Sequence, residues 1–401
     1  MSEPSPHPRE ADAPTPGLLA GVVVLDLASV GPAARCTRLL ADYGATVVKV
    51  GAVPGRGAEP IRPPAYAYSG SRGLRRIAVD LKDPDGREAF AALVRTADVV
   101  VESFRPGVVD RLGVGFGALR DLNPAIILCS TTGYGQSGPR SQWAGHDINY
   151  LAVGGFLAAS EPGADGGPPI AGATIADAAG GGMQAALAVM AALIGRRTTG
   201  RGVHLDVSIA DGVLWLTSLA VDEHLATGAD VGPGHDIISG RYACYDTYRA
   251  ADGRWLAVGA IEPKFYANLC RLLGCEQWLD HQHDDDLQAK IRADFATAFA
   301  TRDRDAWVAA LAGADTCVSP VQTADEVATD PQFAARRAVV AAEAPDGSRF
   351  RQVGAVLAGM VPPAEPVGVR DPSASDAEEL LTEAGVSPER IAELRAKGVV
   401  A

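Results

Sequence analysis

The chain has 401 residues, of which 47% are hydrophobic and 21% charged, an ordinary composition for a globular protein long enough for two domains. Its formal net charge of −13 disfavours a general affinity for nucleic acid or for an anionic membrane surface. An anionic ligand would need a local basic region. The segment from Gly21 to Arg76 offers one, with eight basic residues against three acidic ones, although a solvated basic face is the alternative. The eight are Arg35, Arg38, Lys49, Arg56, Arg62, Arg72, Arg75 and Arg76.

The six cysteines stand in apolar stretches and form no CxxC or metal-binding spacing, so we expect reduced, buried thiols and a cytoplasmic protein. Residues 1–16 are polar and rich in proline, and they lack the hydrophobic stretch of a secretory signal, which predicts a disordered leader. No apolar run is expected to approach the roughly 20 residues that span a bilayer.

Strands and helices alternate through the first half of the chain. The predicted strands are Val22–Leu27, Thr46–Val50, Val99–Glu102, Ile126–Thr131 and Val203–Ile209, and the helices are Ala33–Tyr43, Pro84–Thr96, Ala118–Asn123, 178–195 and Asp211–Thr227. This order predicts an α/β fold with a parallel, doubly wound sheet. The turn after the first strand, Ala28-Ser29-Val30-Gly31-Pro32, lacks the GxGxxG pattern, which disfavours a nicotinamide-dependent oxidoreductase.

A second, smaller domain follows a Gly-rich segment. Residues 228–240 are expected to be a linker, and Asp252-Gly253 predicts a hairpin between Ala243–Arg249 and Trp255–Gly259. Helices at 263–273, 285–300 and 304–312 complete a predicted α+β domain over residues 241–330. The large domain then comprises residues 17–227 and 331–401, and its last helix starts at Ser387 and Pro388.

Two segments of the large domain hold residues suited to proton transfer. In Gly145-His146-Asp147-Ile148-Asn149-Tyr150, His146 is the side chain best suited to exchange a proton near neutral pH, although a hydrogen-bonded structural histidine is the plain alternative. Asp177 stands just before the predicted helix 178–195, where a simple N-cap would explain it.

The first turn of that helix holds three consecutive glycines, 180–182, each of which weakens a helix by roughly 1 kcal/mol relative to alanine. Close approach of a ligand to bare backbone at the positive end of the helix would explain them. In the small domain, Glu262 stands between a predicted strand and a helix, and a plain helix cap is again the alternative.

Together, in this order, these segments resemble the family III CoA-transferase and α-methylacyl-CoA racemase superfamily, over nearly the whole chain from Gly21 to Val400. The resemblance is carried by the segments LLADYGATVVKV (39–50), RRIAVDLKDPDGREAF (75–90), ADVVVESFRPGVVDRLGVG (97–115), TTGYGQSGP (131–139), GHDINY (145–150), TTGRGVHLDVSIADG (198–212), YDTYRAADGRWLAVGAIEPKFY (245–266) and SPERIAELRAKGV (387–399). The histidine of GHDINY is typical of the racemase branch, whereas the transferases share only the aspartate at 177.

The resemblance implies an interlocked homodimer that acts on acyl-CoA thioesters without a metal or a redox cofactor. His146 and Asp177 would exchange the proton on the α-carbon from opposite faces, and Glu262 of the other chain would orient His146. Backbone N–H groups at the start of the helix 178–195, or near Asp147, could hold the enolate oxygen. The residues implied to bind CoA are Arg105, Arg75, Asp147 and Tyr150.

One departure concerns the CoA phosphates. After Val48-Lys49-Val50 the family usually has an acidic residue followed by Arg-Pro, whereas this chain has Gly51, Ala52 and Val53. The arginines that could compensate are Arg56, Arg72 and Arg76.

Two other functions stay open within the resemblance. A family III CoA-transferase would use Asp177 as a nucleophile, forming a mixed anhydride and then an aspartyl-CoA thioester. A CoA-binding protein without catalysis is the second, motivated by the missing arginine at Ala52.

Overall fold

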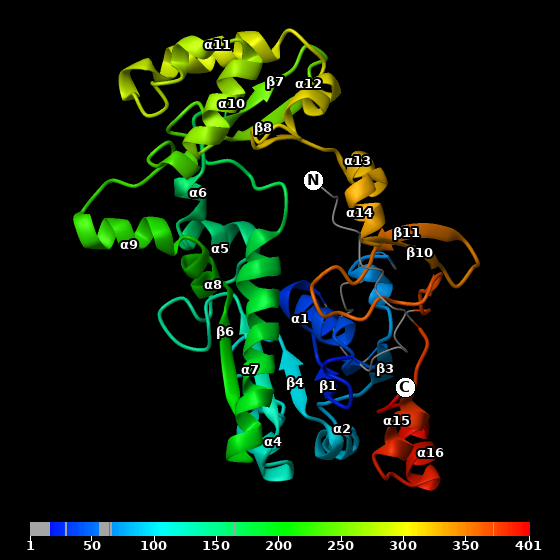
Figure 1. Cartoon of the computed structure of the whole chain (residues 1–401). Helices are drawn as coiled ribbons and strands as arrows, with labels where there is room; N and C mark the ends of the chain where they lie inside the picture. The colour runs from blue at the N-terminus through cyan, green and yellow to red at the C-terminus, as the bar shows by residue number, and fades with distance from the viewer. Residues whose placement is uncertain (1–16, 29, 56–63, 65, 164, 372) are drawn as a thin grey trace. The chain divides into compact units, whose positions relative to one another are not determined.

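The computed structural model describes the chain from Gly17 onward, except for residues 29, 56–63, 65, 164 and 372, so the expected leader lies outside the described residues. The chain divides into two compact units (Figure 1). The larger comprises Met1–Gly154, Ala173–Trp215 and Gln332–Ala401, and the smaller comprises Gly155–Gly172 and Leu216–Pro331.

These units differ from the expected domains at the segment 155–172 and at residues 216–240, which belong to the smaller unit. The expected linker, 228–240, is tied to helix α9 (Ser218–Thr227) by a hydrogen bond of 2.8 Å between His235 Nε2 and Glu223 Oε1. It also contains a short 3₁₀ turn, η3 (Ile237–Ser239), so it is ordered through local contacts.

The larger unit is built on a six-stranded parallel sheet in the order β3-β2-β1-β4-β5-β6. The strands are β1 (Val23–Asp26), β2 (Thr46–Gly51), β3 (Arg75–Ala78), β4 (Val99–Glu102), β5 (Ile127–Thr132) and β6 (His204–Ser208). This is the strand order of Rossmann-type folds. The prediction of a parallel α/β sheet is therefore confirmed, although β3, with two arginines in its four residues, was not predicted.

Helices cover both faces of this sheet, which is why alternate strand residues are buried on opposite sides. On one face, Val24 and Val99 pack with α1 (Gly31–Asp42) and α7 (Gln184–Thr199). On the other, Leu25 and Val100 pack with α2 (Pro84–Thr96), α4 (Phe116–Leu122), α15 (Ala377–Glu383) and α16 (Pro388–Ala396).

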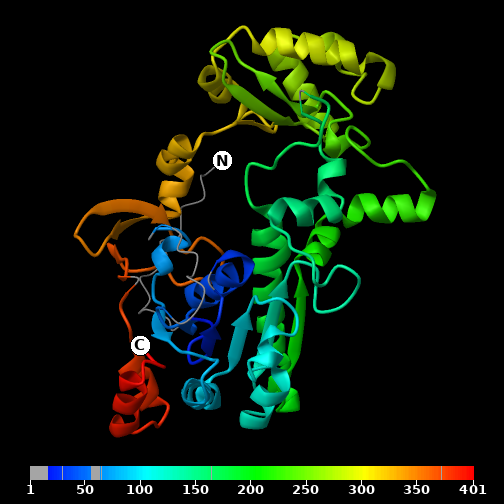
Figure 2. The same cartoon turned by 180° about the vertical axis from the view of Figure 1, so that it is seen from behind.

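The C-terminal segment therefore completes the larger unit. It contributes α15 and α16, red in Figure 1 and Figure 2, and a bridge between Val400 and Val79 beside β3. As predicted, Ser387 caps α16, because its hydroxyl accepts a hydrogen bond of 3.3 Å from the Arg390 N–H. A small sheet of β10 (Val339–Glu343), β11 (Arg349–Val353) and β12 (Val367–Gly368) precedes these helices.

Within the described residues one continuous helix, Ala176–Thr199, is long and apolar enough to cross a membrane by length and composition alone. The expectation that no apolar run approaches that length was wrong for this segment, because residues 178–195 contain no charged side chain. One side of the helix packs into the core through Ala185, Ala186, Val189 and Leu193. A core helix meets the same criterion.

The smaller unit has an antiparallel sheet of β7 (Tyr245–Arg249), β8 (Trp255–Gly259) and β9 (Val318–Pro320). The hairpin at Asp252-Gly253 is confirmed. Its helices are α10 (Pro263–Leu273), α11 (Gln288–Phe299) and α12 (Arg304–Leu311), and their aromatic residues form the core with the strands. Short α-helices among the described residues are α3 (Val108–Arg111), α5 (Asp147–Val153), α6 (Phe156–Ala159), α8 (Ile209–Leu216), α13 (Ala324–Thr329) and α14 (Pro331–Ala335).

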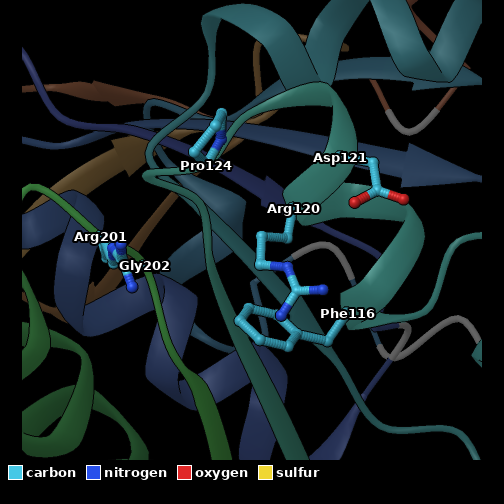
Figure 3. Close-up of a pocket in the computed structure, with 6 residues that line it drawn as sticks. All are labelled: Phe116, Arg120, Asp121, Pro124, Arg201 and Gly202. Atoms are coloured by element: carbon cyan, nitrogen blue, oxygen red, sulfur yellow. The ribbon is translucent and has the colours of Figure 1, made fainter.

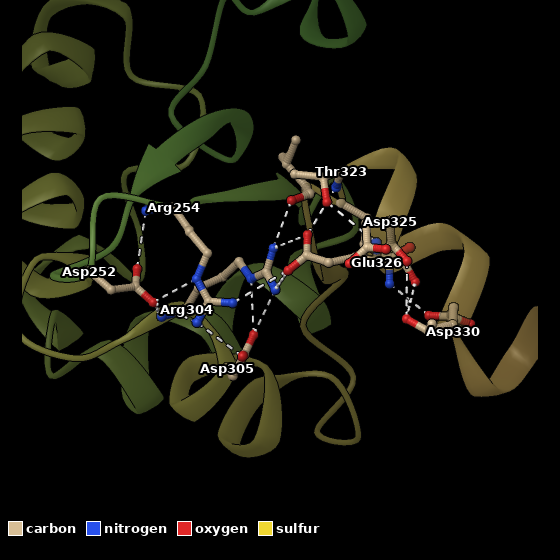
Figure 4. A network of polar contacts seen from close by, with 11 residues as sticks. Asp252, Arg254, Arg304, Asp305, Thr323, Asp325, Glu326 and Asp330 are labelled. Atoms are coloured by element: carbon tan, nitrogen blue, oxygen red, sulfur yellow. Dashed lines mark hydrogen bonds and ion pairs between the residues drawn. The ribbon is translucent and has the colours of Figure 1, made fainter.

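A polar network joins α12 to α13 in this unit (Figure 4). Arg304 is 5% exposed and binds Glu326 with two hydrogen bonds, of 2.5 and 3.0 Å. It also donates to Asp305 and to the carbonyl of Val321. These bonds fasten α13, the last helix of the unit, to its core.

The cysteines are all free among the described residues. Five of the six are buried, as expected, but Cys317 is exposed, because it lies in the loop before β9.

Candidate functional site

The candidate site lies where α5 and the π-helix η2 (Ala176–Met183) meet in the larger unit. η2 continues directly into α7, the crossover helix between β5 and β6. A crossover helix starts at the carboxyl edge of a parallel sheet, where ligands bind in this class of fold. Single-turn π-bulges inside helices often mark functional sites.

Asp147 connects the two helices. Its Oδ1 atom accepts a hydrogen bond of 2.8 Å from the backbone N–H of Asp177. Asp177 therefore lies inside the first turn of its helix, and the expectation that it stands before the helix as the N-cap was wrong. The residue whose carboxylate satisfies this N–H comes from the start of α5, and the two helix N-termini converge on one place.

This arrangement sets the electrostatics of Asp177. Burial raises the pKa of its carboxyl group, and the nearby negative charge of Asp147 raises it further. Arg35 and His146 act in the opposite direction and lower the pKa. Asp177 is thus a partly buried acid close to a histidine, with a perturbed pKa, as is common for groups that transfer protons.

His146 is the N-cap residue of α5, and its backbone N–H donates to Asn149 Oδ1 at 3.0 Å. The side chain is exposed. His146 and Asn149 form a capping box at the start of α5, so the alternative of a structural histidine stays open.

Tyr150 holds the loop that carries His146. It is 7% exposed, and its hydroxyl donates a hydrogen bond of 2.6 Å to the carbonyl of Gly145. Burial and the negative charge of Asp177 raise its pKa to about 12, so it stays a hydrogen-bond donor at neutral pH. Its ring packs edge-on against Tyr134 at 5.3 Å. The role that the structure gives Tyr150 is support of the Gly145–His146 turn.

The three glycines of η2 serve helix packing. A Cβ atom at Gly181 would lie 2.6 Å from Pro32 Cβ, and one at Gly182 would lie 2.8 Å from Arg35 Cβ, both on α1. A Cβ atom at Gly180 would lie 3.0 Å from the Ile209 carbonyl oxygen at the start of α8. The close approach that the glycine run implies is therefore made by neighbouring helices in the first instance.

Glu262 belongs to the smaller unit, where it is the exposed N-cap residue of α10 and makes no side-chain capping bond. The preceding loop is fixed by Gln282, whose side-chain amide donates to the carbonyls of Ala260 and Ile261 at 3.2 and 2.6 Å. The structure thus presents the Glu262 carboxylate from a rigid turn.

Arg105 follows β4 in the larger unit and is exposed. Within the described residues its guanidinium has no ion pair, which leaves it available to an anion. Its loop is positioned by the buried Glu102, whose carboxylate accepts a hydrogen bond of 2.7 Å from the Phe104 N–H.

The rest of the basic segment is largely neutralised inside the chain. Arg75 forms ion pairs with Glu379 at 3.2 Å and Glu383 at 2.7 Å on α15, so a phosphate would compete there with two carboxylates. Arg38 and Arg72 are buried and share the carboxylate of Asp42. A solvated basic face is therefore wrong for these two, and Arg72 is ruled out as the compensating phosphate ligand. Arg56 and Arg62 lie outside the described residues.

A surface pocket lies away from this site (Figure 3). It is lined by Phe116, Arg120, Asp121, Pro124, Arg201 and Gly202. These residues precede β5 and β6, so they lie at the amino edge of the sheet, opposite to the edge where α7 begins. Arg120 extends over the Phe116 ring, 5.8 Å from its centre. The pocket contributes nothing to the site at Asp177.

One residue of the site was not singled out from the sequence. Arg35 appeared there only as part of a basic segment, but its guanidinium lies beside η2 and hydrogen-bonds Thr174. No sequence signal could locate it, because its position depends on how α1 packs on the glycine run.

Comparisons with known proteins identify the family of the chain. Residues 19–372 match CoA-transferase family III. The chain is 36% identical to α-methylacyl-CoA racemase from Homo sapiens over 388 residues, 95% of this chain and 97% of that protein. It is 31% identical to the acetyl-CoA:oxalate CoA-transferase of Acetobacter aceti over 345 residues, 81% of this chain and 86% of that protein. A solved CaiB/BaiF family protein from Brucella suis, 28% identical, matches with a TM-score of 0.69 over 96% of this chain and 100% of that chain. The chain therefore belongs to CoA-transferase family III, the superfamily that also holds the α-methylacyl-CoA racemases.

Proposed function

We propose that the protein is an α-methylacyl-CoA racemase that moves the proton on the α-carbon of a 2-methylacyl-CoA thioester. The observation that carries this proposal is the meeting of His146, Asp147 and Asp177 at two converging helix N-termini. Inversion at a carbon centre requires one group to remove the proton and another to return it on the opposite face. His146 and Asp177 provide two such groups, of different chemistry, close to one another.

The α-proton of a thioester is only weakly acidic, so its removal needs a base and stabilisation of the enolate oxygen. The N–H groups of Asp177 and Ala178 are already bonded, to Asp147 and to the Thr174 carbonyl. The N–H of Asp147 has no hydrogen bond within the described residues. We therefore assign the enolate oxygen to the start of α5, and not to the start of the helix 178–195.

Arg105 is the phosphate ligand that the structure supports best, because its guanidinium is exposed and unpaired among the described residues. A guanidinium suits bidentate phosphate contact. Arg75 stays a weaker candidate, because two glutamates already bind it.

Exchange with solvent deuterium tests the proposal. A single epimer of a 2-methylacyl-CoA, incubated with the protein in D₂O, should gain one deuterium at the α-carbon and yield both epimers. The products are read by mass spectrometry and chiral chromatography. Absence of exchange and of epimerisation, in a folded protein that binds the substrate, would favour a CoA-binding protein without catalysis.

A CoA-transferase is the second candidate, because the chain is also similar to transferases of this family. Asp177 would then attack the thioester and carry an acyl group, and hydroxylamine would trap the acyl-enzyme. Transfer of CoA to a free carboxylate without α-deuteration would assign this reaction and dismiss the racemase.

We further propose that the protein acts as an interlocked homodimer in which Glu262 of one chain orients His146 of the other. Large apolar side chains of the larger unit support an association, since Leu187 and Ile194 on α7 are 66% and 69% exposed and Trp215 is 75% exposed. Sedimentation should give a dimer. Refolding a mixture of His146→Ala and Glu262→Ala chains should restore part of the activity, and mixing without unfolding should not. A monomer by sedimentation would dismiss this assembly.

A further inference from the structure

Arg35 lies on α1 against both ends of η2. Its Nη2 atom donates a hydrogen bond of 2.6 Å to Thr174 Oγ1, three residues before Asp177. At the other end of η2, its Cβ atom lies so near the backbone that a Cβ at Gly182 would be 2.8 Å away. One side chain, remote in sequence, thus spans the turn that carries Asp177.

A tyrosine holds the guanidinium in place. The Arg35 guanidinium carbon lies 5.2 Å from the centre of the Tyr68 ring, an arrangement that favours a cation over the ring face. The Tyr68 hydroxyl accepts a hydrogen bond of 3.3 Å from the Gly31 N–H at the start of α1. Tyr68 has a φ of 49°, a left-handed conformation that costs about 1–3 kcal/mol in a residue other than glycine.

The charge of Arg35 is not neutralised by the described part of the chain. There it forms no ion pair, and its buried Nε atom has no hydrogen-bond partner. Its neighbour Arg38, one turn further along α1, is paired with Asp42 at 2.7 Å. Arg35 therefore keeps a positive charge for a group that comes close to it, and that group is Asp177.

We propose that Arg35 is the positioning residue of Asp177: it fixes the turn before Asp177 through Thr174 and supplies the positive charge that offsets Asp147. The proposal rests on the role of Asp177 in the proposed function. Asp147 from α5 is needed to hold the Asp177 N–H, but it also brings a negative charge next to the carboxyl group. A guanidinium, always protonated in proteins, compensates for this charge without itself competing as an acid.

Several groups face Asp177 from the elements around it. Asp147, His146 and Tyr150 come from α5, and Arg35 comes from α1. The neighbouring helix α8 presents the apolar Ile209 and Val213 to the η2 backbone. Of the two groups that favour the ionised form of Asp177, Arg35 is the stronger and His146 the weaker.

The test is to titrate Asp177 in the free protein. Difference infrared spectra between each protein and its Asp177→Asn version isolate the carboxyl band. Arg35→Gln should raise the pKa of Asp177 by about one unit or more, because an opposite charge nearby is removed. Arg35→Lys keeps the charge and should shift it less. The limb of the pH profile of α-proton exchange that reports the ionisation of Asp177 should move to higher pH in Arg35→Gln.

Arg120→Gln, which removes an exposed arginine at the far edge of the sheet, is the control and should leave the titration unchanged. A folded Arg35→Gln protein with an unshifted Asp177 would overturn the proposal, whatever its rate. If Arg35→Gln does not fold, Thr174→Val tests the positioning bond. This variant should slow α-proton exchange while shifting the pKa of Asp177 little, and a Thr174→Val protein that exchanges as fast as the wild type would contradict the proposal.

If the unmodified protein shows no α-proton exchange, the proposed function is refuted. The infrared titration of Asp177 would still test the role of Arg35.

Discussion

Arg304 in the smaller unit and Arg35 in the larger unit are both held by several contacts, but they differ in what those contacts do to their charge. Arg304 is 5% exposed and surrounded by acceptors, including both carboxylate oxygens of Glu326. Hydrogen bonding to Arg304 lowers the pKa of Glu326 to about 2, and the same bond raises the pKa of Arg304. Arg35 has a hydroxyl and a ring face as its partners.

The partners of an arginine thus distinguish a structural charge from a charge that acts on a site. A buried arginine whose donors are all matched by carboxylates and carbonyls stabilises the fold and has nothing left for a ligand. The positive charge of an arginine whose partners are neutral is not offset by them, so it acts electrostatically on the nearest titratable group. Arg105, exposed and unpaired among the described residues, extends the comparison to an arginine available to the substrate. Substitution of each of the three arginines should therefore change a different property of the protein.

The largest expected effect is the loss of α-proton exchange when Asp177 or His146 is replaced. Asp177→Asn and His146→Ala should each lower α-proton exchange by about 10²–10⁴-fold, because a positioned acid or base contributes that much. Exchange rates at saturating substrate measure this loss, and thermal unfolding should be little changed. Asp121→Asn, an exposed aspartate of the same unit, is the control. Near wild-type exchange in either variant would show that the residue is structural.

Arg304→Met should affect stability and leave the chemistry intact. Two carboxylates, Asp305 and Glu326, lose the cation that binds both of them, so the melting temperature should fall by several degrees. The pH dependence sharpens the test, since the pKa of Glu326 falls from 4.5 to about 2 on folding. The stabilisation by Arg304 is complete above pH 4.5 and is lost as the pH falls toward 2. The difference between wild type and variant should therefore shrink over that range.

Arg271→Met removes an exposed arginine of the same unit and is the matched control for melting. An Arg304→Met protein that melts like the wild type at pH 7 would contradict the structural role of the network. An Arg304→Met protein that keeps its melting temperature but loses α-proton exchange would show that Arg304 serves the reaction and not the fold, contrary to the distinction drawn from Arg35.

Periodicity and turn chemistry predict the regular parts of this chain. The helix Pro84–Thr96 and the strand Val99–Glu102 have the same bounds in the structure, and the Asp252-Gly253 hairpin forms as predicted. β3 was missed because its arginines mask a strand that exists by pairing with β2. The placement of 155–172 and 216–240 in the smaller unit depends on tertiary contacts that no local pattern contains.

The same limit applies to the site. His146, Asp177 and Glu262 were singled out by residue type and by resemblance. The bond from the Asp177 N–H to Asp147, and the role of Arg35, depend on how helices distant in sequence pack together. Three glycines in a row were interpreted as a place where a ligand approaches the backbone, whereas the structure places Pro32 and Arg35 of α1 and the start of α8 against them.

The smallest effect is expected at Arg105, where substrate binding alone should suffer. We propose that its exposed guanidinium binds a CoA phosphate, a contact that would be equally strong before and during proton transfer. Arg105→Ala should therefore raise KM for a 2-methylacyl-CoA about tenfold, which corresponds to about 1.4 kcal/mol, and should change kcat little.

Because phosphate contacts between exposed charges are screened by salt, the KM difference between wild type and variant should narrow at high salt. Arg120→Ala, which removes another exposed arginine at the amino edge of the sheet, should leave both constants unchanged. If Arg105→Ala keeps the wild-type KM, the phosphates are held elsewhere, and Arg75 becomes the next residue to test. If it lowers kcat instead, Arg105 acts on the reacting centre and does not belong with the substrate-binding arginines.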